Sequence, residues 1–288
     1  MLRLPFWLLL LASALTSQAL PTLQPRDAYF ASVRTRLTHD HGGKHRDPPD
    51  KYFHESTFHP HYDGRFAASK LPEDARKTAL TALVQTYLST MSSIGAETWI
   101  MHGSLLGWYW NRRIMPWDSD VDVQMSEEGM RELAGYYNMT VHTFDVARME
   151  GEGKGQGRGE GKTGRRRSYM IEVNPHYTNA STADSHNVID ARWIDMETGL
   201  FIDITTLRRD REAQVKGYKG HMYSKDKHRI LEDDIFPLRD SVFEGMPVKI
   251  PYAYAELLEG EYGRKALAKS SVENHRWDRE RMEWVKIV

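Results

Sequence analysis

Three aspartates stand at alternate positions, Asp118, Asp120 and Asp122, a short distance after a Gly103-Ser104 pair. Side chains on a strand repeat every second residue, so carboxylates in this pattern point to the same side. Carboxylates paired on one strand face bind one or two divalent cations, which neutralise phosphate oxygens and order an in-line attack. The pattern therefore predicts a metal and phosphate centre, with Asp120 and Asp122 as metal ligands.

A calcium loop and an acid-rich surface strand are the competing explanations of the acidic segment 114–124. An EF-hand loop that began at Asp118 would need Gly at its sixth position and Glu at its twelfth. Those positions hold Val123 and Gly129, which excludes such a loop. Val121 and Val123 also give the acids a strand with one apolar face, which a solvated loop lacks. The segment is therefore interpreted as a metal-binding strand.

An isolated acid, Asp203, lies within the apolar segment 200–205. A carboxylate among apolar neighbours costs free energy unless it has a partner. Asp203 would complete a carboxylate triad at the metal centre, either as a ligand or as the base that takes the acceptor's proton. A structural acid hydrogen-bonded to a turn is the other explanation.

Phosphate binding is expected at Gly103-Ser104, because glycine lets the backbone approach a phosphate and amides at a helix start favour an anion. An ordinary strand-to-helix turn explains the pair equally well. Cationic side chains match phosphate oxygens. Four of them are candidates for binding the diphosphate of a donor: Arg112, Arg113, Lys225 and His228. For each, a solvated surface charge is the simpler explanation.

The hydrophobic pattern predicts the elements that must position these residues. Pro72 and two acids start a helix whose apolar face repeats at three- and four-residue spacing as far as Gly95. A strand over 97–101 then leads into the Gly-Ser turn. The other expected elements are a helix over 105–110, the acidic strand over 114–124, a helix over 126–137 with Ser126 as N-cap, a strand over 169–173, a hairpin of 192–195 with 200–205, short strands over 235–251, a helix over 252–259 and a polar tail.

Length and composition limit the classes of function. With 288 residues, the chain is expected to form one domain with tails. The formal net charge of −1 argues against nucleic-acid binding, for which a basic surface is typical. The absence of cysteine excludes cysteine nucleophiles, thiolate zinc sites and iron–sulfur clusters.

The N-terminal residues 1–19 are typical of a secretory signal peptide, with a basic start, an apolar run and small residues before a cleavage site at Ala19. The apolar run is shorter than the ~20 residues that span a bilayer, so no stable membrane span is expected once the signal is cleaved. Residues 20–70 are predicted to form an extended segment. Its His59 and His61 either contact the site or are solvated on a surface-packed extension, and the second explanation is favoured.

Residues 150–167 alternate Gly with polar and charged residues and end in three arginines. Such a segment cannot bury enough apolar surface to offset its ordering entropy, which predicts a disordered insertion. It contains a formal dinucleotide fingerprint and a Gly-Lys-Thr triplet. Neither follows an apolar strand, and Gln156 replaces the upstream glycine of a P-loop, so both motifs are rejected.

Taken together, the motifs resemble the LicD family, which includes the fukutin-related proteins. The resemblance rests on His102–Gly107 (HGSLLG), Pro116–Asp122 (PWDSDVD), the acid of Phe201–Ile204 (FIDI) and a later series. That series is Phe236-Pro237-Leu238, Phe243-Glu244-Gly245, Ile250-Pro251 and Tyr262-Gly263. The resemblance covers residues 71–267 apart from the insertion, and this version is most similar to fungal proteins linked to mannosylphosphate addition to glycans.

The resemblance implies an α+β, nucleotidyltransferase-like fold over residues 71–288, with a mixed β-sheet flanked by helices and a C-terminal region of short strands and a helix. It implies that a phospho-sugar or phospho-alcohol, foremost mannosylphosphate, passes from a nucleotide-diphosphate donor to a glycan or glycoprotein hydroxyl. The implied cofactor is Mg²⁺ or Mn²⁺, and the implied location is the secretory pathway, in the Golgi lumen or outside the cell. The implied site consists of Asp120 and Asp122 as metal ligands, Asp203 as third carboxylate, Gly103-Ser104 at the donor phosphate and Asp118 as an auxiliary acid.

Two other functions remain open. A glycosyltransferase whose Asp-x-Asp motif holds a nucleotide-sugar through Mn²⁺ would need a Rossmann-like half before Asp120, and the preceding residues are too few and too irregular. A non-catalytic accessory protein of glycan phosphorylation would keep the fold without turnover, and the presence of all three acids argues against it.

Overall fold

The computed structural model describes residues 47–145 and 166–287. The predicted signal peptide 1–19 and most of the predicted insertion lie outside the described residues. Within the described ranges, no helix combines the length and apolar character needed to cross a bilayer.

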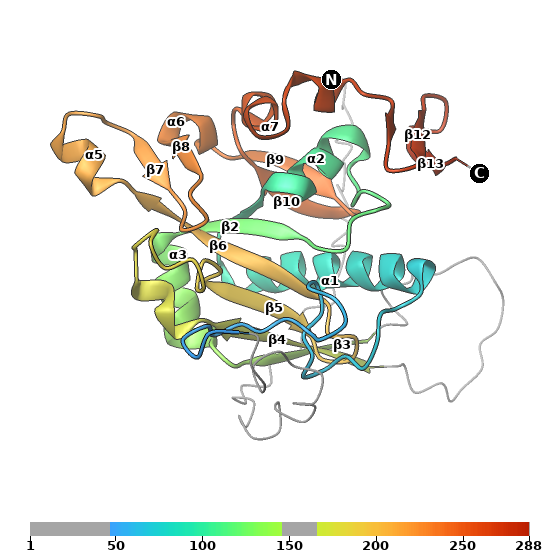
Figure 1. Ribbon diagram of the computed structural model, residues 1–288, viewed down its shortest axis with the longest axis horizontal. Coiled ribbons are helices and arrows are strands. Elements are labelled where there is room, and N and C mark those ends of the chain that lie inside the picture. The colour runs from blue at the N-terminus through green and yellow to red at the C-terminus, as the bar shows by residue number, and fades with distance from the viewer. Residues whose placement is uncertain (1–46, 146–165, 288) are drawn as a thin grey trace, which may run out of the picture.

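A ten-stranded mixed sheet forms the centre of the structure (Figure 1). Its main path runs β3 (Val141–Asp145), β4 (Arg166–Val173), β5 (Ala191–Asp195), β6 (Phe201–Arg209), β2 (Asp122–Ser126), β1 (Thr98–Ile100), β10 (Met246–Ile250) and β9 (Arg239–Phe243). A ribbon of β7 (His221–Tyr223) and β8 (Arg229–Leu231) continues from β6. The pairs β2–β6 and β1–β10 are parallel, and the remaining pairs are antiparallel. The predicted mixed sheet is confirmed.

Helices flank this sheet, as the sequence predicts. They are α1 (Glu73–Ile94), α2 (His102–Asn111), α3 (Glu127–Glu132) with a following π-helical turn (Leu133–Tyr137), α5 (Arg211–Val215), α6 (Glu232–Ile235), α7 (Tyr254–Tyr262) and two 3₁₀ turns (Pro175–Thr178 and Arg264–Leu267). Local signals set several of their ends. Gly95 closes α1 in the left-handed region with φ 74°. Ser126 caps α3, because its hydroxyl accepts a hydrogen bond of 3.1 Å from the Gly129 amide.

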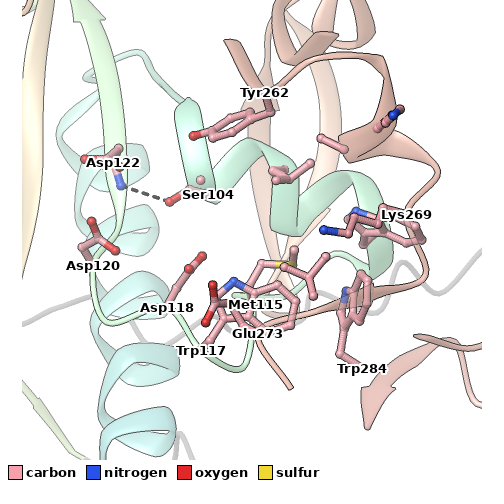
Figure 2. A pocket seen from close by; sticks show the side chains of 16 residues that line it. Ser104, Met115, Trp117, Asp118, Asp120, Asp122, Tyr262, Lys269, Glu273 and Trp284 are labelled. Atoms are coloured by element: carbon pink, nitrogen blue, oxygen red, sulfur yellow. Dashed lines mark hydrogen bonds between the residues drawn. The ribbon is translucent and has the colours of Figure 1, made fainter. Parts of the chain in front are cut away.

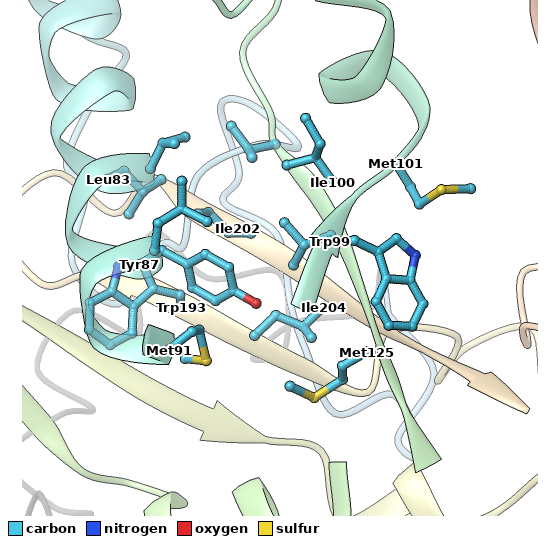
Figure 3. Packing of buried hydrophobic residues seen from close by; sticks show 14 of the residues in the cluster. Leu83, Tyr87, Met91, Trp99, Ile100, Met101, Met125, Trp193, Ile202 and Ile204 are labelled. Atoms are coloured by element: carbon cyan, nitrogen blue, oxygen red, sulfur yellow. The ribbon is translucent and has the colours of Figure 1, made fainter. Parts of the chain in front are cut away.

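The core lies between α1 and the sheet, where α1 packs across β5, β6 and β10. Figure 3 shows Leu83, Tyr87 and Met91 of this helix facing buried residues of the sheet such as Trp193 and Ile204. Every apolar residue of the predicted helix face is buried, so the spacing identified the face correctly: Leu80, Leu83, Val84, Tyr87, Leu88 and Met91. The packing of α1 holds the sheet in place, and this sheet includes β2, which carries the last acid of the acidic segment.

The acidic strand is shorter than predicted. β2 begins only at Asp122, so Asp118 and Asp120 lie in the loop before it. The reason is that the neighbouring β1 ends opposite Val123, where the chain turns into α2. The loop returns closely across α2, because a Cβ on Gly107 would lie 2.4 Å from the carbonyl oxygen of Arg113. Glycine is therefore required at that crossing.

Two boundaries of the sequence analysis also need correction. α2 begins at His102, so Gly103-Ser104 forms part of its first turn and does not precede it. Arg166 and Arg167, which the composition assigned to the insertion, are the first residues of β4 and pair with Asp145 and Phe144. Arg167 reaches the buried Asp195 at 2.7 Å, and this ion pair lets a charged residue enter the sheet.

The C-terminal residues form structure where a polar tail was expected. They make a three-stranded sheet of β11 (Ser271–Val272), β12 (His275–Asp278) and β13 (Glu283–Lys286). Trp277 and Trp284 of this small sheet pack against Trp110 of α2, with ring centroids 4.9 Å from it in both cases. The contact holds the C-terminal sheet beside the acidic loop.

Candidate active site

A cleft of about 860 Å³ opens between the acidic loop, the first turn of α2 and the C-terminal region. Figure 2 shows Asp118, Asp120 and Asp122 on one side of it, with Lys269 and Trp284 on the opposite side. The alternating acids therefore share one wall of one cavity, although two of them belong to a loop.

Parallel pairing of β2 with β6 brings the distant acid beside Asp122 of this wall. In the register of the two strands Asp122 stands directly beside Asp203. The Asp203 carboxylate accepts a hydrogen bond of 2.7 Å from Arg192 Nε on β5, and its side chain is 20% exposed. The structure thus brings together the predicted acids and adds Arg192, whose role no sequence signal indicated.

Burial and mutual repulsion act on these carboxylates. Burial raises the pKa of Asp122 to about 8, and the negative charge of Asp120 adds to the rise. Burial also raises the pKa of Asp118 to about 7, again with help from Asp120 and against the pull of Arg76. Burial raises the pKa of Asp203, while Arg192 opposes the shift. The wall therefore gathers more carboxylates than the neighbouring cations balance, and two of them favour the protonated form until a cation replaces the proton.

Oxygen donors with surplus negative charge fit a hard divalent cation such as Mg²⁺ or Mn²⁺. Asp120 has a side chain that is 40% exposed and is free to turn toward such an ion. The oxygens of Asp120, Asp122 and Asp203 are not gathered as tightly as two other groups of the described residues, whose ligand atoms lie within 4.8 Å of one another. Binding of an ion would therefore draw the three carboxylates closer together.

The first turn of α2 supplies amide groups on the edge of the cleft. Ser104 has a second role there, because its hydroxyl oxygen accepts a hydrogen bond of 3.0 Å from the Asp122 amide. The hydroxyl proton stays available to donate to a phosphate oxygen. Gly103 faces Asp118, since a Cβ at this position would lie 3.6 Å from Asp118 Oδ2. Ser104 thus positions the start of β2 as well as lining the cleft.

The four predicted diphosphate-binding cations do not line the cleft. Lys225 is fully buried, with Nζ 2.7 Å from Asp190, and this argues against the predicted role. Arg112 lies over the ring of Trp108, with its guanidinium carbon 3.9 Å from the centroid. Arg113 is exposed on the loop after α2. His228 lies on the loop between β7 and β8 and is taken up below.

Other cationic and aromatic side chains line the cleft instead. Lys265 and Lys269 follow α7, and Tyr262 ends that helix with its hydroxyl directed into the cavity (Figure 2). Trp117 precedes Asp118 on the acidic loop, and its ring stands 5.1 Å from that of Trp284 between centroids. The resemblance motifs include Trp117 and Tyr262, whereas no motif marks Lys265, Lys269 or Trp284, so the sequence pattern missed these three.

The N-terminal extension also reaches the site. His61 Nδ1 lies 2.7 Å from the hydroxyl oxygen of Ser119, and its Nε2 lies 3.7 Å from a carboxylate oxygen of Asp120. The favoured expectation of solvated histidines is wrong for His61. The extension is anchored by the Asp63 amide, which donates to the carbonyl of Gly199 at 2.7 Å.

Comparison with known proteins supports the resemblance to the LicD family. Residues 95–155 match the family described as LicD/FKTN/FKRP, nucleotidyltransferase domain. Mannosyltransferase regulator 4 of Saccharomyces cerevisiae is 30% identical over 128 residues, which cover 44% of this chain and 10% of that protein. Mannosyltransferase regulator 14 of the same organism is 26% identical over 211 residues, which cover 72% of this chain and 18% of that protein. The chain spans less than a fifth of the length of either relative. The family match and these two relatives confirm its resemblance to the LicD family.

Proposed function

We propose that this chain, as a LicD-family protein, transfers a phosphate-linked sugar or alcohol from a nucleotide-diphosphate donor to a hydroxyl of a glycan or glycoprotein. Mannosylphosphate is the first candidate for the transferred group, and the secretory pathway, in the Golgi lumen or outside the cell, is the proposed location. The observation that carries the proposal is the parallel register of β2 and β6, which sets Asp122 beside Asp203 next to a large cleft.

In this proposal Asp120 and Asp122 hold Mg²⁺ or Mn²⁺, with Asp203 as a third ligand or as the base and Asp118 as an auxiliary acid. The bound ion supplies positive charge that offsets the developing charge on the phosphate oxygens. The acceptor oxygen bonds to the phosphorus that carries the sugar, while the bond from that phosphorus to the nucleotide oxygen breaks. Asp203 takes the acceptor's proton in its role as base, and Arg192 fixes one of its carboxylate oxygens.

The cleft walls suggest how the donor would lie. Amides of the first turn of α2 and the hydroxyl of Ser104 face the space in front of Asp122, which suits the donor's phosphates. Lys265 and Lys269 add positive charge for the same diphosphate. The aromatic wall formed by Trp117 and Trp284 offers faces on which a base or a sugar stacks.

The names of the two yeast relatives support a role in mannose-containing glycans. Both carry the word mannosyltransferase. The chain's near-zero net charge favours a sugar-linked substrate over nucleic acid as partner. The proposed partners are accordingly a nucleotide-diphosphate-linked donor and a glycan acceptor.

An assay for the released nucleotide tests the proposal. Purified protein receives Mn²⁺, a mannose-rich glycan acceptor and, in separate reactions, GDP-mannose, CDP-ribitol or CDP-choline. Release of the nucleoside monophosphate from one donor is expected, because the phosphate next to the sugar leaves with the sugar. Release of the nucleoside diphosphate would favour an Asp-x-Asp glycosyltransferase instead.

A non-catalytic accessory role is the second candidate, and one observation favours it. Both relatives are named regulators, and each is far longer than this chain. The same assay separates the two functions. No release of nucleotide from any donor, with no difference between the natural chain and Asp122→Ala, would favour the accessory role.

The raised carboxylate pKa values predict a pH-dependent effect of the metal on stability. The folded protein holds protons on Asp122 and Asp118 well above the pKa of about 4 that these groups have in the unfolded chain. The folded state therefore binds more protons than the unfolded state between about pH 4 and 8, and stability contributed by these groups falls as the pH rises. A cation that replaces the protons should stabilise the fold more at about pH 8 than at about pH 6.

Thermal unfolding with and without Mn²⁺ at both pH values measures this effect. The rise in Tm on adding Mn²⁺ is expected to be larger at the higher pH and to shrink in Asp122→Asn. An equal rise at both pH values would contradict a metal centre built on these carboxylates.

A further inference from the structure

A second cluster of metal-binding side chains lies beside the start of α2. His102 is the first residue of that helix, His228 comes from the loop between β7 and β8, and Glu261 comes from α7. One ligand atom of each residue lies within 4.8 Å of the other two. None of the three lines the cleft that contains the aspartates. Three separate parts of the chain thus converge at a point that the proposed transfer reaction does not use.

Two buried ring nitrogens of this cluster, His102 Nε2 and His228 Nδ1, make no hydrogen bond. His102 Nδ1 lies 2.9 and 3.0 Å from the two carboxylate oxygens of Glu261. Its Nε2 is buried, makes no hydrogen bond, and lies 3.8 Å from Asp226. The ring of His228 is 4.5 Å from the ring of His102 between centroids. A buried polar atom without a partner costs free energy, so its presence calls for a ligand or a functional role.

The backbone conformation of His102 also indicates a functional role for this residue. His102 has φ 52°, in the left-handed region that residues other than glycine seldom adopt. Such strain persists where surrounding contacts hold it, and it concentrates at functional sites. Here the contact with Glu261 on α7 holds the side chain in place.

The charges around the cluster favour a cation. Asp226 lies 3.1 Å from His228 Nδ1, and Glu261 lies against His102. The carboxylate of Asp122 also acts electrostatically on His102 from the neighbouring site. When the two imidazoles are neutral, as metal binding requires, these carboxylates leave a net negative charge that a divalent ion would balance.

We propose that His102, His228 and Glu261 form a second cation site, which takes a transition metal of the Zn²⁺ class and is separate from the carboxylate centre. Imidazole nitrogens with one carboxylate oxygen suit Zn²⁺, whereas an all-oxygen set suits Mg²⁺ or Mn²⁺. Asp226 behind His228 would act as the outer carboxylate that orients a metal-bound histidine. Three protein ligands leave a fourth position for water or substrate. This proposal does not depend on the transfer activity.

The ligand atoms would need only small movements. Zinc bonds of about 2.0–2.2 Å place tetrahedral ligand atoms roughly 3.4 Å apart, closer than the present limit of the cluster. The side chains of His228 and Glu261 are 41% and 25% exposed, so both have room to turn inward. His102 is the most enclosed of the three, with a side chain that is 12% exposed.

Cobalt binding to the full chain tests the proposal, because Co²⁺ substitutes for Zn²⁺ and absorbs visible light strongly when it is four-coordinate, as at a zinc-type site. The background variant is His186→Asn, which removes the other three-residue group, formed with Asp50 and Asp184. After treatment with a chelator, one equivalent of Co²⁺ should bind with visible absorption. Zn²⁺ should displace it, and excess Mg²⁺ should not.

Variants in this background identify the ligands. His228→Gln and Glu261→Gln should each weaken Co²⁺ binding by at least about a hundredfold, more than the loss of an outer partner causes. His221→Gln, a histidine of β7 outside the cluster, is the matched control and should bind as the background does. Circular dichroism establishes that each variant is folded.

Two results would overturn the proposal. One is equal Co²⁺ affinity and absorption in the background and in both cluster variants. The other is loss of the Co²⁺ signal in Asp120→Asn/Asp122→Asn with the signal intact in His228→Gln, because the ion would then sit in the carboxylate centre. Retention of the signal in the double aspartate variant supports a separate site.

Discussion

Replacing Asp122 by asparagine is expected to reduce the release of nucleoside monophosphate by at least about a hundredfold, since outer partners of metal ligands alone cost 10- to 100-fold. The residue stands beside Asp203 on paired strands and borders the cleft. Asparagine keeps the shape but removes the negative charge that would hold the cation in the proposed function. Initial rates at saturating Mn²⁺ measure the effect.

The same substitution should leave the fold intact. The pKa of Asp122 is raised to about 8 by burial, so the folded protein already favours the neutral side chain at neutral pH. Without metal, Asp122→Asn should therefore unfold at the same temperature as the natural chain or at a higher one. Asp240→Asn is the matched control, because that side chain is 89% exposed on β9 and should affect neither rate nor Tm. An active Asp122→Asn enzyme would exclude this carboxylate as a metal ligand.

The largest loss of stability is expected at Asp190. Its carboxylate is fully buried and binds Lys225 Nζ at 2.7 Å and the guanidinium of Arg208 at 3.0 Å. Asp190→Ala leaves two buried positive charges without a partner, and breaking such pairs costs about 3–5 kcal/mol. The free energy of unfolding from urea titrations measures the change.

An exposed ion pair provides the comparison. Arg264 and Glu259 have side chains that are 90% and 42% exposed, and Arg264→Ala should change the free energy of unfolding by less than about 1 kcal/mol. If Asp190→Ala lowered the free energy of unfolding by as little as Arg264→Ala, the ion pairs of Asp190 with Lys225 and Arg208 would not stabilise the fold.

Local sequence signals predicted the parts of the fold that depend on neighbours along the chain. Pro72 and Gly95 marked the ends of α1, and the Ser126 cap marked the start of α3. The role of Lys225 was beyond such signals, because its partner Asp190 belongs to another part of the chain and meets it only in the folded core. A lysine in a polar stretch gives no indication that it will be buried.

For the candidate site, too, the sequence indicated individual residues but not the contacts between distant parts of the chain. Chemistry-bearing residue types singled out Asp120, Asp122 and Asp203 as candidates, since alternating acids and an acid within an apolar strand are unusual. Pairing of β2 with β6 is a long-range event, so only the structure gives the register between those acids. The part of the opposite wall that comes from the C-terminal sheet was missed because β11, β12 and β13 contain only two to four residues each, too few for a visible alternation.

The position of the connection between β3 and β4 has a consequence for how this chain tolerates changes in length. The residues between Asp145 and Arg166 connect β3 to β4, which form the outer edge of the sheet. β5 and β6 separate that edge from β2 and its aspartate. Evolution can therefore lengthen or shorten this connection without shifting the acids of the site relative to one another. For protein engineering, the same connection is the natural place to insert a tag or a reporter domain.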